Sequence, residues 1–250
     1  MKKSLISIGI WMCIFLWSSV LAFKNPIFPW TEFSTGLQRI YNPIHKIYEQ
    51  KSEEEVEQEW IEHVDYYSDE SVRKFLDDNH PLSTNYEAQD TRKIISDFIT
   101  NKSSSFYLRN EAAEAFELMA WSFSNAFDFK AKLTINSARR SQAYQRKLAS
   151  SCSTARCAKP WTSEHEAWLA LDLWVNGWNI RAWSGKYYQW LIDNAHLYGF
   201  HNSYQKWIGI DGKMVEPRHW RYVWVRLATI LHDRWQTFAE FFYENIEKKN

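Results

Sequence analysis

Two short stretches of the chain place histidine and carboxylate residues at spacings that suit metal chemistry. The first reads SEHEAWLALDL and contains His165 and Asp172; the second reads VEPRHWRYVW and contains Glu216 and His219. A catalytic zinc ion takes three histidine or carboxylate ligands and keeps one position open for water. His165, Asp172 and His219 could supply this set, with Glu216 as an unligated general base. On spacing alone, apolar-flanked histidine and aspartate are more often hydrogen-bonded structural side chains, so the flanking residues have to decide.

The sequence around both stretches resembles the VanY-type D-alanyl-D-alanine carboxypeptidases, which are zinc peptidases of bacterial cell walls. Four motifs agree in order and spacing, namely SARRSQAYQ, SEHEAWLALD, NAHLYGF and EPRHWRYV. The resemblance covers residues 133–225 and extends from about residue 110 onward. It implies the α+β zinc-peptidase fold shared with Hedgehog-like domains, in which helices flank a small antiparallel sheet.

The resemblance also implies roles for individual residues. His165, Asp172 and His219 match the zinc ligands, and Glu216 matches the catalytic base that takes a proton from the attacking water. Arg140 matches the arginine that binds substrate near the scissile carbonyl and stabilises the developing negative charge. The expected cofactor is therefore Zn²⁺.

Two further polar residues, Gln145 and Ser163, match residues that help to hold the substrate's terminal D-residue. The function implied is removal of the terminal D-alanine from peptidoglycan stem peptides. An L,D-carboxypeptidase and a stem-peptide endopeptidase remain alternatives within the family. A noncatalytic wall-binding protein is the alternative from another class, and the presence of Glu216 argues against it, because binding alone needs no base.

The chain departs from the family pattern at four positions. Trp168 and Trp224 stand where the family has glycine, Ser203 where arginine is usual, and Arg218 where tryptophan is usual. The proposed ligands are kept, but the substrate pocket need not be the usual one.

Tryptophan is abundant and glycine scarce. The chain has 15 Trp and 7 Gly, whereas an average composition would give roughly 18 glycines at this length. Trp207 also lies in a turn-like stretch that would suit glycine. One cause would explain both anomalies, namely UGA codons written as Trp in an organism that reads UGA as glycine. The alternative is a Trp-rich protein with a genuinely remodelled pocket.

The composition and the N-terminal residues indicate which partners and which cellular location to expect. The 250 residues carry 30 Lys+Arg and 30 Asp+Glu, which gives no electrostatic case for nucleic acid binding. Residues 1–22 have two lysines followed by an uncharged apolar run, which predicts a signal peptide or an uncleaved membrane anchor. The protein is therefore expected to be exported. In that setting, Cys152 and Cys157 are expected to form a disulfide.

Periodicity predicts the elements that must position these residues. Residues 23–109 are expected to form a helical N-terminal region, which includes EEEVEQEWIEHVDYY and DTRKIISDFIT. A catalytic domain is expected to follow at residues 110–250. Within that domain AKLTINSA, LALDLWV and MVEPRHWRYVWV read as strands. NEAAEAFELMAWSFSNAFDF, RRSQAYQRKLASS, KYYQWLIDNAHLYGF and a closing RLATILHDRWQTFAEFFYENIEKK read as helices. This irregular mixture favours an α+β fold.

Overall fold

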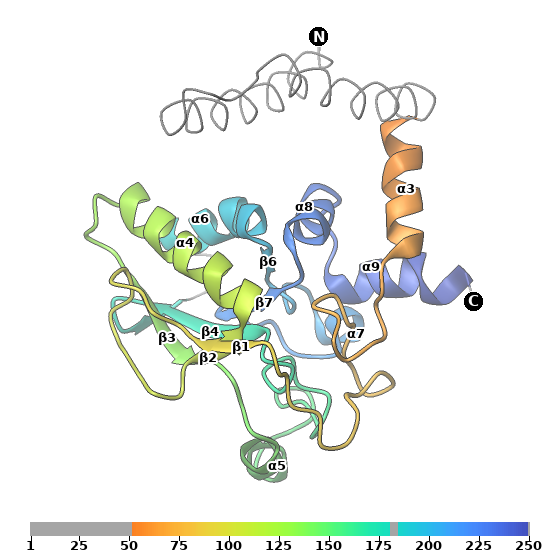
Figure 1. Ribbon diagram of the computed structural model, residues 1–250, viewed down its shortest axis with the longest axis horizontal. Coiled ribbons are helices and arrows are strands. Elements are labelled where there is room, and N and C mark those ends of the chain that lie inside the picture. Colours follow the sequence, from red (N-terminus) through yellow and green to blue (C-terminus); the bar gives the residue numbers. More distant parts are fainter. Residues whose placement is uncertain (1–51, 181–184, 250) are drawn as a thin grey trace, which may run out of the picture. The chain divides into compact units, whose positions relative to one another are not determined.

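The computed structural model describes residues 52–180 and 185–249 (Figure 1). The chain divides into two compact units, residues 1–60 and 61–250, and the candidate site belongs to the second. The expected signal peptide or anchor, residues 1–22, lies outside the described residues. Within the described part, no helix is both long and apolar enough to cross a membrane.

An antiparallel sheet of five strands carries the site. Its strands are β3 (Leu133–Ser137), β4 (Ala170–Val175), β5 (Trp178–Asn179), β6 (Phe200–His201) and β7 (His219–Tyr222). The order is β3-β4-β7-β6, and β5 pairs with β4. The strands expected at AKLTINSA and LALDLWV are confirmed as β3 and β4. The third, β7, is shorter than expected and begins two residues after Pro217, which cannot donate to a strand ladder.

Helices, a two-stranded ladder and irregular segments make up the rest of the described chain. The helices are α3 (Glu53–His63), α4 (Asn110–Ala126), α5 (Gln142–Ser150), α6 (Lys186–Asn194), α7 (Ile208–Asp211), α8 (Val225–Asp233) and α9 (Phe238–Asn245), with 3-10 turns η1 (Ala195–Tyr198) and η2 (Glu247–Lys249). The ladder pairs β1 (Thr91–Lys93) with β2 (Tyr107–Arg109). The mixed α+β class expected from the sequence is confirmed.

Two expected helices differ from the structure. DTRKIISDFIT was expected to be helical, but its first residues form β1, and Ile94 N–H donates onward to the Phe106 carbonyl at 2.9 Å. The single closing helix is instead divided into α8 and α9. The second begins with a capping box, in which Thr237 and Glu240 satisfy each other's backbone N–H groups.

The helix expected over KYYQWLIDNAHLYGF is confirmed in its first part as α6. After α6, the chain continues through η1 and ends at Gly199, whose φ is 79°. A Cβ at Gly199 would lie 2.6 Å from the ring of Tyr222. Glycine is therefore required here both by the left-handed backbone and by the close approach of β7.

Strand alternation separates the core from the site. Leu171 and Leu173 are fully buried in the hydrophobic core together with Phe116 of α4, so Asp172 between them points to the other face of the sheet. On the neighbouring strand, His219 is the direct Cα partner of Asp172. The antiparallel register thus brings these two side chains together on one face.

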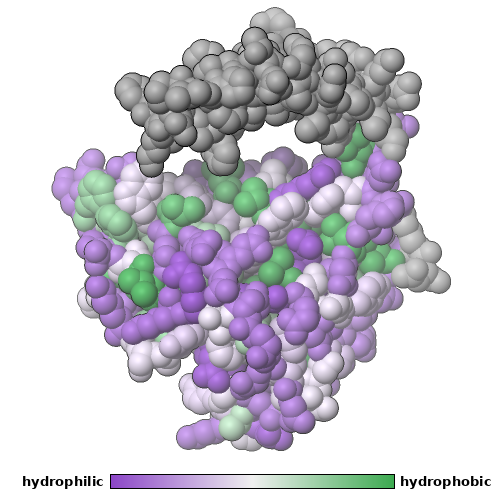
Figure 2. All heavy atoms as spheres, in the orientation of Figure 1, coloured by the Kyte–Doolittle hydropathy of each residue, from purple (hydrophilic) through white to green (hydrophobic). Residues whose placement is uncertain are grey.

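The visible face of the described residues shows no large apolar patch. On the face shown in Figure 2, hydrophobic residues occur singly or in small groups among hydrophilic ones. Scattered exposed apolar residues are normal for a globular protein and need no functional explanation. The buried polar cluster on the sheet is the more informative feature.

Candidate metal centre

Three buried side chains converge on the face of the sheet that carries Asp172. One potential ligand atom from each of His165, Asp172 and His219 lies within 4.8 Å of the others. His165 Nε2 is 3.5 Å from Asp172 Oδ1, and His219 Nδ1 is 3.4 Å from the same oxygen. Ligands about 2.1 Å from a tetrahedral ion are roughly 3.4 Å apart. The spacing therefore suits a single tetrahedral ion.

Hydrogen bonds fix which histidine nitrogens are available to that ion. His165 Nδ1 is 2.6 Å from the Ala138 carbonyl oxygen, which can only accept, so Nδ1 carries the hydrogen and Nε2 is left free. His219 Nε2 is 2.7 Å from a carboxylate oxygen of Glu164, which leaves Nδ1. Both His165 Nε2 and Asp172 Oδ1 are buried without a hydrogen-bond partner in the described part of the chain. Buried orphans of this kind suit metal ligands, and the residues present fit the ion.

The electrostatics of the cluster favour a neutral His165 and a positively charged His219. Burial lowers the pKa of His165 to about 4, and the charge of Arg140 acts in the same direction. Burial also opposes the charged form of His219, but the hydrogen bonds that its ring donates to the Asp172 and Glu164 carboxylates raise its pKa to about 9. Burial by itself would raise the pKa of Asp172, yet the neighbouring His165 and His219 hold it well below its usual value. Near neutral pH the metal-free site therefore contains a charged His219.

A pH dependence of metal binding follows. Because His219 must lose its Nδ1 proton to bind an ion, the affinity for a divalent metal should rise about tenfold per pH unit from about pH 7 towards the pKa of about 9. In the metal-free protein, the raised pKa stabilises the fold fully below the unfolded value of about 6.5, and this contribution is lost as the pH rises through about 9. Competition titrations against a chelator at several pH values measure the affinity. An affinity independent of pH in this window would contradict the assignment.

The predicted arginine lies beside the cluster. Arg140 Nη2 donates to Asp172 Oδ2 at 2.7 Å, and its Nε donates to the Ser137 hydroxyl at 3.1 Å. Asp172 therefore has one oxygen on Arg140 and the other facing the histidines. Arg140 also lines a cleft of about 240 Å³ together with Trp161, Glu166 and Trp168. Arg140, which donates to Asp172, therefore also borders this cleft.

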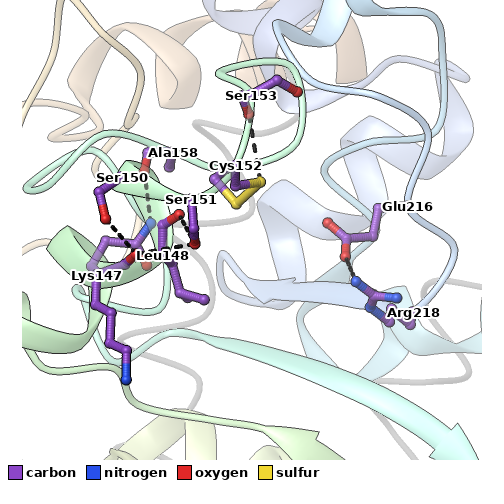
Figure 3. The surroundings of a disulfide bond; sticks show 11 residues. Lys147, Leu148, Ser150, Ser151, Cys152, Ser153, Ala158, Glu216 and Arg218 are labelled. Carbon is purple, nitrogen blue, oxygen red and sulfur yellow. Dashed lines mark hydrogen bonds and ion pairs between the residues drawn. A yellow bond between two sulfur atoms is a disulfide. The ribbon is translucent and has the colours of Figure 1, made fainter.

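The predicted base approaches the site through its backbone. The Glu216 carbonyl accepts the N–H of His219 at 3.1 Å, which closes a tight turn before β7. The Glu216 carboxylate is ion-paired with Arg218 at 2.6 Å, and Figure 3 shows the two side chains turned towards each other. Arg218 is therefore the charged partner of the Glu216 carboxylate in this structure.

The two predicted substrate-holding residues are both buried, and Gln145 has a structural bond. Its amide donates to the Ala158 carbonyl at 2.7 Å, while its Oε1 has no hydrogen-bond partner among the described residues. Ser163 is buried two residues before His165, where its carbonyl accepts the N–H of Glu166. Their roles in holding substrate stay predictions.

The expected disulfide between Cys152 and Cys157 is confirmed. It closes a short loop that follows α5, and Figure 3 shows this bond. Met214 N–H donates to the Ala155 carbonyl of this loop at 2.8 Å. The disulfide therefore supports the segment that leads to Glu216.

Two charged residues of the site were missed at the level of sequence. Glu164 precedes the first candidate ligand, and Arg221 follows the last by two residues; both are almost fully buried and lie 3.4 Å apart. The signal was present in the sequence, because Arg221 stands within the otherwise apolar stretch WRYVWV. A charge in a buried strand requires a buried partner.

Comparison with known proteins agrees with this geometry. Residues 105–225 match the family described as VanY: D-alanyl-D-alanine carboxypeptidase. A curated relative, the putative carboxypeptidase YodJ of Bacillus subtilis (strain 168), is 31% identical over 195 residues, which span 72% of this chain and 69% of the relative. The chain belongs to the VanY family. As a member with a His-Asp-His cluster, it is a metallo-carboxypeptidase.

Other known proteins are similar to parts of the chain or to its fold. The D-alanyl-D-alanine carboxypeptidase of Enterococcus faecalis (strain ATCC 700802 / V583) is 36% identical over 92 residues, which cover 36% of this chain and only 33% of the relative. The structure of the LdcB LD-carboxypeptidase has a TM-score of 0.61 at 28% identity and covers 70% of this chain and 87% of LdcB. A VanY D,D-pentapeptidase from the VanB-type resistance cassette, solved in complex with Zn(II), has a TM-score of 0.54 at 20% identity and covers 67% of this chain and 97% of that protein. At 20% identity, the likeness to the VanY D,D-pentapeptidase shows the fold alone.

Proposed function

We propose that this protein is a zinc-dependent peptidase that removes the terminal D-alanine from peptidoglycan stem peptides. The observation that carries the proposal is the convergence of His165 Nε2, Asp172 Oδ1 and His219 Nδ1 within 4.8 Å. Each of the three side chains has its other polar atom engaged by the protein. Three protein ligands are typical of a catalytic zinc site, which keeps a fourth position open, whereas a structural zinc site has four.

The residues around the ligands suit peptide hydrolysis. A zinc ion in such a site acidifies a water and polarises a carbonyl. Glu216 would accept the proton from the attacking water and return it to the leaving amine. Arg140, fixed by Ser137 and Asp172, would stabilise negative charge on the scissile carbonyl oxygen. Gln145 and Ser163 would hold the terminal D-residue.

A second specificity also has an observation in its favour. The likeness to the LdcB LD-carboxypeptidase, at 28% identity, is accompanied by a cleft beside Arg140 that two tryptophans line. An L,D-carboxypeptidase that removes the terminal D-alanine of a tetrapeptide is therefore the second candidate. An endopeptidase and a noncatalytic wall-binding protein are outcomes of the same test.

Purified protein with zinc, incubated with a stem pentapeptide or a stem tetrapeptide, tests these specificities by mass spectrometry. We expect loss of one alanine from the pentapeptide, abolition of the reaction by a chelator and its recovery with added zinc. Loss of alanine from the tetrapeptide alone supports the second candidate, and cleavage within the stem supports an endopeptidase. An intact peptide that nevertheless binds supports a wall-binding protein. Hydrolysis by protein shown to contain no metal would overturn the zinc proposal.

The proposed partner is the peptidoglycan stem peptide, which lies outside the cytoplasmic membrane. The apolar N-terminal run of residues 1–22 supports export of the protein. Expression of the full chain followed by N-terminal sequencing distinguishes a cleaved signal peptide from an anchor.

A further inference from the structure

A buried chain of charged groups connects a candidate metal ligand to the N-terminal part of the second unit. The Glu164 carboxylate is 2.7 Å from His219 Nε2 and accepts a bond from the Ser203 hydroxyl at 2.8 Å. Its other oxygen is 3.4 Å from Arg221 Nη1. All four side chains are 5% exposed or less. A carboxylate so placed holds the Nε2 hydrogen of His219 and leaves Nδ1 for a metal.

Arg221, the arginine of this buried charged cluster, is held by backbone carbonyls far away in the sequence. Arg221 is completely buried, and its Nη2 donates to the carbonyls of Val72 at 3.3 Å and Lys74 at 2.9 Å. Residues 64–90, here called the strap, form an irregular segment without helix or strand. The strap precedes the region that matches the family model, which starts at residue 105. Two of its carbonyls therefore solvate the cation that faces Glu164.

Side chains fix the strap where it meets Arg221. Phe75 stacks on Phe242 of α9 with ring centroids 4.2 Å apart and meets Phe238 edge-on at 5.3 Å. Lys74 pairs with Asp69 at 3.0 Å. The strap is thus held against α9 at the residue next to Lys74, whose carbonyl accepts from Arg221.

We propose that Glu164 is a positioning residue for the metal ligand His219 and that the strap, through Arg221, maintains it. The inference rests on the proposed metal-dependent function and extends it to a segment outside the matched region. Removing a carboxylate behind a metal-bound histidine costs about 10–100-fold in metal affinity. A substitution that weakens the packing of the strap should act through Arg221 and Glu164 and should also lower the metal affinity.

Zinc affinity, measured by competition against a fluorescent chelator, is the readout, because it is independent of hydrolysis. Glu164→Ala is expected to lower the affinity about 10–100-fold. Glu164→Gln should lose less, because its amide oxygen can still accept the bond from His219. The matched control is Leu231→Ala, a fully buried core position on α8, which should lower thermal stability but leave zinc affinity unchanged. Unchanged affinity in Glu164→Ala would overturn the positioning role.

A double-mutant cycle tests the strap. Phe75→Ala should weaken zinc binding in the wild-type background but have little further effect in Glu164→Ala, because both act through one path. Additive losses, or no loss in Phe75→Ala, would overturn the coupling. If Glu164→Ala fails to fold because Arg221 is left unpaired, the double variant Glu164→Gln with Arg221→Met removes both charges; it should fold and still bind zinc more weakly. If the wild type itself binds no zinc, the proposed function fails instead.

Discussion

A Glu216→Gln variant is expected to bind metal as the wild type does and to lose most of its turnover, by about 10²–10⁴-fold. The amide cannot accept a proton from the attacking water, while none of the three candidate ligands is changed. The turn in which His219 N–H donates to the Glu216 carbonyl involves only backbone and is kept in the variant. The measurements are kcat on a stem peptide and zinc content.

The present position of the Glu216 carboxylate, paired with Arg218, does not argue against this role. Catalytic contacts are often loose without substrate and tighten in the complex. Glu114→Gln, an exposed carboxylate on α4 with its side chain 70% exposed, is the control and should keep full turnover. If Glu216→Gln retained near-normal kcat, the base would have to be another group.

The ligands could be found from sequence because their surroundings carry a specific local pattern. The strand LALDLWV and the strand after Pro217 were both recognisable, and their antiparallel pairing places Asp172 opposite His219. The contacts of Glu164 could not be read in the same way. Its partner Arg221 is 57 positions away in the sequence numbering, and the carbonyls of Val72 and Lys74 have no side-chain signature. Long-range pairing also explains the error at β1, where helical spacing gave way to pairing with β2.

The second large prediction concerns four tryptophans with a backbone typical of glycine. Trp161, Trp168, Trp224 and Trp235 have φ values of 72°, 62°, 75° and 55°. Four of the 15 tryptophans lie outside the described residues, so these are four of the remaining 11. A left-handed backbone costs a residue with a Cβ about 1–2 kcal/mol, and for a bulky residue it is a genuine outlier. Trp168 and Trp224 are also the positions where the resembled family has glycine.

The codon hypothesis makes a prediction about the gene. If the organism reads UGA as glycine, we expect UGA at positions 161, 168, 224 and 235. Trp220, buried in β7, should be encoded by UGG. Trp207, the third position suspected from sequence, has φ −82°, which any residue adopts, so its backbone gives no reason for glycine. UGG at all four left-handed positions would leave a Trp-rich protein with a remodelled pocket as the explanation.

The protein itself provides an independent test with a matched pair of positions. Trp235 and Trp207 are 67% and 66% exposed, so replacing either side chain by glycine removes a similar, small amount of burial. Trp235→Gly relieves a left-handed backbone and should raise the free energy of unfolding by about 1 kcal/mol. Trp207→Gly relieves nothing and should lower it by about 0.5–1 kcal/mol through the added freedom of the unfolded chain. Denaturant unfolding of both variants measures the difference, and shifts of the same sign would contradict the hypothesis.

Trp168→Gly should in addition widen the cleft beside Arg140 and raise kcat/KM on a stem peptide, because the indole at position 168 lines that cleft.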